Sequence, residues 1–204
     1  FNYILKNLSG NELSVNLLKT LFDQIIAAVV YKELEVVVLL FPLLDLIYTK
    51  LDENIQFDVN EIQLKLFKDV LSEMERSCTA TFRKVYAKTM IDLLPKIGLS
   101  MTMYLKRLVN ALFVYIQWPD EELKLLSIQI VEYLCKKLWP RIPNHSKKLL
   151  EAFFISYEEI QDSKSSELIE KHQYIIQYIC SCSLQSKTKH IIKETIESLE
   201  SSGK

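Results

Sequence analysis

Cysteine and histidine are the side chains in this sequence that could hold a transition metal. A structural zinc site needs four such ligands at short, regular spacings, and no C-x-x-C, H-x-x-x-H or H-E-x-x-H arrangement occurs. Cys180 and Cys182, with His190, come nearest to one, but we interpret the two thiols as buried or half-buried residues of a helix. We therefore expect no metal and no other cofactor. The free thiols, which include Cys78 and Cys135, favour a reducing compartment.

Three consecutive carboxylates, Asp120, Glu121 and Glu122, could bind a metal or exchange protons. They also follow Pro119, a residue favoured at the start of a helix, where negative charge offsets the helix dipole. We interpret them as helix-start residues. His172 is interpreted as an exposed residue on a solvated helical face.

Phosphate-binding loops need closely spaced glycines, and the three glycines here, Gly10, Gly98 and Gly203, are far apart. The sequence therefore predicts a protein that is not an enzyme. The alternative is an enzyme, namely a hydrolase or a metal enzyme whose site has no recognisable sequence motif.

The scarcity of glycine also bears on the fold, because none of the three follows Asn or Asp, as a tight strand turn would favour. Apolar residues instead recur at helical spacing. Polar turns near Lys32, Ser77, Pro119 and Gln161 separate the apolar segments at intervals of 42 to 45 residues, which is the period of HEAT-type repeats. We predict an all-α protein, an α-solenoid of HEAT/armadillo-like helical hairpins in a single domain over residues 1–204. The expected hairpins cover 11–50, 58–97, 99–139 and 143–184, followed by a terminal helix over 187–200.

The longest apolar run has nine residues, 36–44, well below the roughly 20 that span a bilayer. This excludes a transmembrane span, and no secretory signal is visible. We therefore expect a cytoplasmic or nuclear location and no membrane partner.

The charge distribution is uneven although the total is only -1. Residues 83–148 carry 12 basic and 5 acidic side chains, between two acidic flanks. Three interpretations stay open: solvated helix faces, a basic ridge for an acidic protein surface, or a nucleic-acid site. The two tryptophans are packing anchors or binding hot spots. The candidate partner-binding residues are Arg83, Lys84, Lys106, Arg107, Trp118, Lys136, Lys137, Trp139 and Arg141.

The segment 96–143 carries a family resemblance. Its marks are Gly98-Leu99, the run Tyr104-Leu105-Lys106-Arg107, the Pro119-Asp120 turn, and the closing run Leu138-Trp139-Pro140-Arg141-Ile142. With these features it resembles the C-terminal HEAT region of the TELO-two-interacting protein two family.

That resemblance implies a non-enzymatic co-chaperone or adaptor subunit of the Triple-T complex. Its partners would be TELO-two and TELO-two-interacting protein one type subunits and the Hsp90 machinery. Its role would be the maturation and stability of the large kinases related to phosphatidylinositol 3-kinase. The alternatives are a nucleic-acid-binding helical repeat, against which the near-neutral total charge argues, and a cargo-binding one.

Overall fold

A computed structural model of the 204-residue chain describes residues 59–161 and 165–184, together with residues 20, 24 and 43. The chain divides into two compact units, 1–73 and 74–204, and each is considered by itself. The predicted terminal helix 187–200, and the predicted hairpin 11–50 apart from residues 20, 24 and 43, lie outside the described residues. The single domain over 1–204 stays a prediction.

Every regular element in the described residues is helical. In chain order they are α4 (Val59–Arg76), α5 (Ala80–Ile97), the 3-10 helix η1 (Gly98–Tyr104), α6 (Leu105–Ile116), α7 (Glu121–Leu138), the 3-10 helix η2 (Ile142–Asn144), α8 (Ser146–Ile160) and α9 (Ser166–Leu184). No strand occurs among these residues, which confirms the all-α prediction for this part of the chain.

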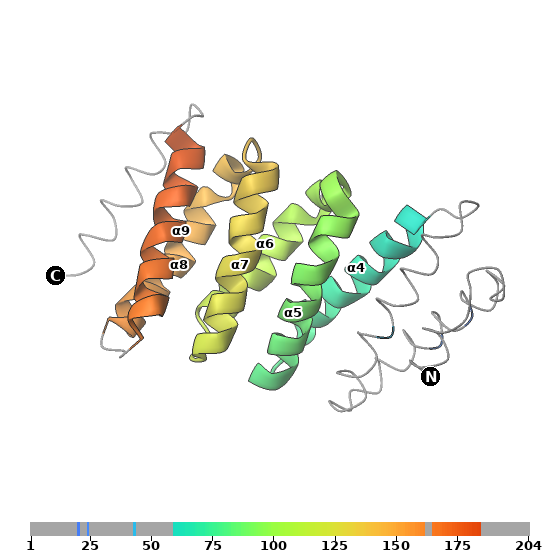
Figure 1. Ribbon diagram of the computed structural model, residues 1–204, viewed down its shortest axis with the longest axis horizontal. Helices are drawn as coiled ribbons and strands as arrows, with labels where there is room; N and C mark the ends of the chain where they lie inside the picture. Colours follow the sequence, from blue (N-terminus) through green and yellow to red (C-terminus); the bar gives the residue numbers. More distant parts are fainter. Residues whose placement is uncertain (1–19, 21–23, 25–42, 44–58, 162–164, 185–204) are drawn as a thin grey trace. The chain divides into compact units, whose positions relative to one another are not determined.

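The helices of the second unit lie in two rows. Helices α5, α7 and α9 pack side by side in one row, and α6 and α8 form the other (Figure 1). Helices within a row run parallel. In the first row the hydroxyl of Tyr133 on α7 donates to the Leu94 carbonyl on α5 at 3.3 Å, and in the second the ammonium of Lys148 on α8 donates to Asn110 on α6 at 2.8 Å. The unit thus has two ends, a lower end where α5, α7 and α9 begin and an upper end where they finish.

The core between the rows is built from helical stripes. On α7 the apolar stripe Leu123, Leu126, Ile130, Val131 and Leu134 is buried along its whole length. Each such side chain stabilises the fold by about 1.5–3 kcal/mol relative to an exposed position. None of the described helices combines the length and apolar character needed to cross a bilayer.

Two helix boundaries near Gly98 are set by the local path of the backbone. Helix α5 includes Pro95 and continues to Ile97, which is also the last residue of the predicted hairpin 58–97. The helix ends at Gly98, whose positive φ of 56° suits glycine and whose N–H donates to the Leu94 carbonyl. The first α-helix of the predicted hairpin 99–139 begins only at Leu105, because the chain first forms η1.

Asp120 starts α7, as its sequence context indicates. Its backbone is extended, and its side chain accepts a hydrogen bond from the Leu123 N–H at 2.9 Å. Glu121 and Glu122 occupy the first turn. The interpretation of this acidic trio as helix-start residues is therefore confirmed.

We predict that Asp120→Ala lowers the free energy of unfolding by about 1 kcal/mol, because the first turn of α7 loses its cap. Urea denaturation measures the loss. The matched control is Asp120→Asn, which keeps the accepting oxygen but removes the charge that pairs with Lys84 at 2.9 Å. Asp120→Asn should retain most of the stability of the parent chain. An equal loss of stability in the two variants would show that the ion pair, and not the cap, stabilises the fold.

Candidate functional site

The nine predicted contact residues do not share one face. Arg83, Lys84 and Trp118 lie at the lower end, in the first turns of α5 and just after α6. The other six lie toward the upper end: Lys106 and Arg107 at the start of α6, Lys136 and Lys137 in the last turn of α7, and Trp139 and Arg141 in the connection that follows. The structure divides the predicted ridge between two ends of the helices.

Arg83 is a packing residue, contrary to its prediction as an exposed contact. Its side chain is 7% exposed, and Nε and Nη2 both donate to the Ser77 carbonyl, at 3.0 and 2.8 Å. The guanidinium lies 3.9 Å from the ring centre of Trp118 and 5.3 Å from that of Tyr115. A cation placed over aromatic faces in a dry site stabilises the fold. Arg83 and Trp118 thus anchor the turn between α4 and α5 to the end of α6.

Three other predicted cations are paired within the fold. The pairs are Lys84 with Asp120 and Glu122, Arg107 with Glu75, and Lys136 with Glu132, at 2.6 to 3.0 Å. Hydrogen bonds to the two carboxylates raise the pKa of Lys84, and the bond to Glu75 raises that of Arg107. Partly solvated pairs of this kind contribute little to stability but compensate the charges a partner would meet.

The remaining predicted residues, Lys106, Lys137, Trp139 and Arg141, are exposed. No ion pair involves these three cations in the part of the chain that the structure describes. Trp139 is 49% exposed, an unusual position for a large aromatic ring. These four residues are the ones that remain available to a partner.

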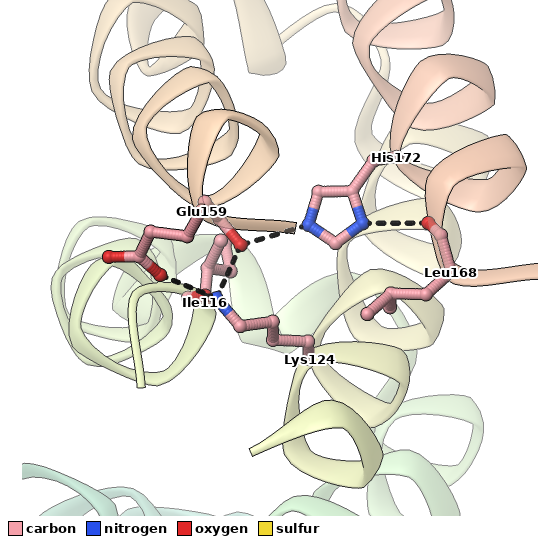
Figure 2. Close-up of polar contacts among 6 residues, drawn as sticks. Ile116, Lys124, Glu159, Leu168 and His172 are labelled. Carbon is pink, nitrogen blue, oxygen red and sulfur yellow. Dashed lines mark hydrogen bonds and ion pairs between the residues drawn. The ribbon is translucent and has the colours of Figure 1, made fainter. Parts of the chain in front are cut away.

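A buried polar cluster, not foreseen from the sequence, joins four helices near the lower end (Figure 2). Lys124 on α7 is 3% exposed, and its ammonium donates to the Ile116 carbonyl at 3.2 Å, to Ser156 Oγ at 2.7 Å and to Glu159 at 3.0 Å. A buried ammonium is costly unless its hydrogen bonds are made, and here α6 and α8 supply three acceptors. The sequence signal was the position of Lys124, which falls on the same helical stripe as Ile128 and Val131.

His172 on α9 extends this cluster, and its interpretation as a solvated residue is wrong. The ring is fully buried between α8 and α9 because helix α9 turns it inward, edge-on to Phe153. Nδ1–H donates to the Leu168 carbonyl at 2.9 Å, so Nε2 accepts the Ser156 hydroxyl at 3.0 Å. Burial, together with the nearby Lys124 ammonium, lowers the pKa of His172, which keeps the ring neutral.

Serine between a lysine and a histidine resembles an activated nucleophile. Here Ser156 and His172 are both fully buried, and the Lys124 ammonium donates to the hydroxyl rather than accepting its proton. The arrangement therefore acts as a structural link between helices. Among the described residues no group of three or more His, Cys, Asp or Glu side chains could hold a metal ion.

Comparison with known proteins gives one significant finding. No family model and no solved structure matches the chain. A protein of Rattus norvegicus named TELO2-interacting protein 2 is 29% identical over 86 residues, which cover 41% of this chain and 17% of the rat protein. The chain resembles TELO2-interacting protein 2. The resemblance to the TELO-two-interacting protein two family is thereby confirmed, and the matched region spans less than a fifth of the length of TELO2-interacting protein 2.

We predict that Arg83→Lys lowers the free energy of unfolding by about 1–3 kcal/mol. Lysine keeps the charge but loses the planar stack on Trp118 and the double donation to Ser77. Chemical denaturation measures the change. The control is Lys106→Arg, a substitution at an exposed cation of the same unit, which should change the free energy of unfolding by no more than about 0.5 kcal/mol. Equal effects of the two substitutions would contradict the packing role of Arg83.

We also predict that acid destabilises the fold through His172. Its pKa in the folded chain lies below the ordinary value of 6.5, so below that pH the unfolded chain takes up a proton more readily. The free energy of unfolding should therefore fall as the pH drops from about 7.5 to 5.5. His172→Gln should reduce this slope in urea titrations at each pH.

His145→Gln is the matched comparison, because burial and Lys106 also lower the pKa of His145, at a half-buried position. A pH slope in His172→Gln as steep as in the parent chain would show that the buried ring does not titrate in this way.

Proposed function

We propose that this chain is a non-enzymatic protein-binding scaffold, an α-solenoid of HEAT-like hairpins that serves as an adaptor or co-chaperone subunit of a Triple-T-type complex. In that role it would contact TELO-two and TELO-two-interacting protein one type subunits and the Hsp90 machinery. It would help to mature and stabilise kinases related to phosphatidylinositol 3-kinase, in the cytoplasm, the nucleus or both. The observation that carries the proposal is the match to TELO2-interacting protein 2.

The packing of the second unit supports the solenoid part of the proposal. The hairpins α6–α7 and α8–α9 contact each other row by row, α6 with α8 and α7 with α9. Each hairpin thus buries its apolar stripes against the next one along the chain, which is how helical repeats form extended surfaces for other proteins. The two buried links, Arg83 with Trp118 and Lys124 with Ser156, hold neighbouring hairpins in fixed register.

The distribution of charge supports a protein partner over nucleic acid. Lys84, Arg107 and Lys136 are paired with carboxylates of this chain, so fewer cations remain to neutralise phosphates. The sealed environment of Ser156 and His172 supports the non-enzymatic role.

Affinity purification of the tagged full chain, followed by quantitative mass spectrometry, tests the proposal. We predict recovery of TELO-two and TELO-two-interacting protein one type subunits well above an unrelated helical-repeat bait. Phe153→Ala, which removes a fully buried ring from α8 and costs about 3–5 kcal/mol, should abolish recovery.

The matched control is Gln129→Ala on the exposed face of α7, which should recover both subunits at the parent level. Failure of the parent chain to recover either subunit would refute the Triple-T assignment. Equal recovery by Phe153→Ala would show that the folded stack is not what binds.

A further inference from the structure

The upper end of the second unit gathers basic side chains from four helices. The last turns of α5 and α7, the first turns of α6 and α8 and the connection after α7 all meet there (Figure 1). The exposed cations, which we call the basic edge, are Lys96, Lys106, Lys136, Lys137, Arg141 and Lys147. Among the described residues at this end, Glu132 pairs with Lys136, and Glu75 pairs with Arg107 beside Lys106, while Asp92 and Glu151 lie more than a turn from the ends of α5 and α8. At the lower end, by contrast, several carboxylates are paired with cations of the chain: Asp120 and Glu122 with Lys84, Glu122 also with Lys88, Glu159 with Lys124, and Glu167 with Lys171.

Favourable interaction with a helix dipole explains the positions of only some cations of the basic edge. Lys136 and Lys137 lie in the last turn of α7, where the helix dipole favours positive charge. Lys106 and Lys147 lie in the first turns of α6 and α8, which contain no acidic residue, and there the dipole disfavours positive charge. These cations occupy positions that cost the helices stability, as expected for residues that meet an external negative charge.

Exposed apolar side chains occur at the same end. Leu99 and Met103 project from η1 with 73% and 70% of their surface exposed, Trp139 directly follows α7, and Leu184 is the last residue of α9. Four of the six large apolar side chains that are exposed in the described residues therefore lie beside the basic edge. Clustering of such side chains on a soluble protein marks a contact surface.

A pocket of about 240 Å³ opens between the last turns of α7 and α9 at this end. Its lining residues are Cys135, Lys136, Trp139, Tyr178, Ser181 and Cys182. Burial raises the pKa of Cys135 and of Cys182, so both thiols stay protonated and the inner wall is only weakly polar. The pocket thus offers a large side chain an aromatic and thiol lining, with a cation at its rim.

We propose that the basic edge binds an acidic segment of a partner protein, with one aromatic or large aliphatic side chain of that segment inserted in the pocket between α7 and α9. Carboxylates of the segment pair with Lys137, Arg141 and Lys106, and Trp139 packs against the inserted side chain. Aromatic and arginine side chains beside a pocket are the usual anchors of protein interfaces. This inference rests on the proposed scaffold function and names the partner chemistry of one surface.

A nucleic acid fits the same end less well. Phosphates would satisfy the cations and Trp139 could stack on one base, but Leu99, Met103 and Leu184 offer no flat face for further bases and would stay exposed. An acidic peptide with apolar side chains satisfies both the charged and the apolar parts of the surface.

The test is a selection from a random peptide library displayed on phage, with the immobilised full chain as the target. Recovered peptides should be rich in Asp and Glu and should share one large apolar position. Synthetic copies of the recovered peptides, labelled for fluorescence anisotropy, should bind less tightly as salt rises.

Variants then locate the binding site. Lys137→Glu combined with Arg141→Glu should weaken the peptide by at least about tenfold, and so should Trp139→Ala. Ser181→Trp fills the pocket from its exposed rim without changing the core. It replaces Trp139→Ala as the pocket variant if Trp139→Ala alters the circular dichroism spectrum, and it should weaken the peptide in the same way. The control is Lys88→Glu combined with Lys171→Glu at the lower end, which makes the same total change of charge and should leave the affinity unchanged.

The inference would be overturned if the recovered peptides were not acidic. It would also be overturned if the Lys137→Glu and Arg141→Glu pair or the pocket variants left the peptide affinity unchanged, or if a single-stranded oligonucleotide bound the basic edge in preference to the peptides. The proposed Triple-T role is judged separately, by recovery of its subunits from cells. A chain that binds acidic peptides but recovers neither subunit would keep this surface and lose that role.

Discussion

The buried ammonium of Lys124 is the interaction on which the packing of the second unit depends. Removing such a charge from water costs several kcal/mol, so the fold is stable only if the ammonium finds acceptors inside. It finds them on α6, through the Ile116 carbonyl, and on α8, through Ser156 and Glu159. Because Ser156 in turn bonds to His172, one cation fixes α7 against α6, α8 and, indirectly, α9.

Fixed helix directions explain how a chain with a net charge of -1 comes to distribute its charges unevenly between the two ends of the second unit. Parallel helices in each row bring like termini together, so residues far apart in sequence share an end. At the lower end the carboxylates at the start of α7 meet Lys84 and Lys88 of α5, and the charges compensate. At the upper end Lys106, Lys137 and Arg141 have no such partner among the described residues, so attraction for an external acid remains.

The features of the fold that could be predicted from the sequence are those set by neighbouring residues. The apolar stripe of α7 and the cap at Asp120 follow from helical spacing and from the preceding proline, and the structure has both. The path of the chain between Gly98 and Leu105 could not be predicted in this way. A short 3-10 segment and the start of an α-helix have the same local composition, and packing against the neighbouring helices decides between them.

The candidate site was predicted less completely, because burial of a polar side chain depends on contacts across the fold. The excess of positive charge in residues 83–148 is visible in the sequence, but the sequence does not show which cations lie at an end of the helices and which are buried in the core. Arg83 and Lys84 are adjacent, yet one stacks inside on Trp118 while the other reaches Asp120 at the surface, since neighbours on a helix point about 100° apart. His172 and Glu170 on α9 differ in the same way, because the His172 ring is buried while Glu170 is exposed. A partner selects among exposed groups only, so the positions that this rotation leaves outside, Lys106, Lys137, Trp139 and Arg141, are the residues through which the chain can be recognised.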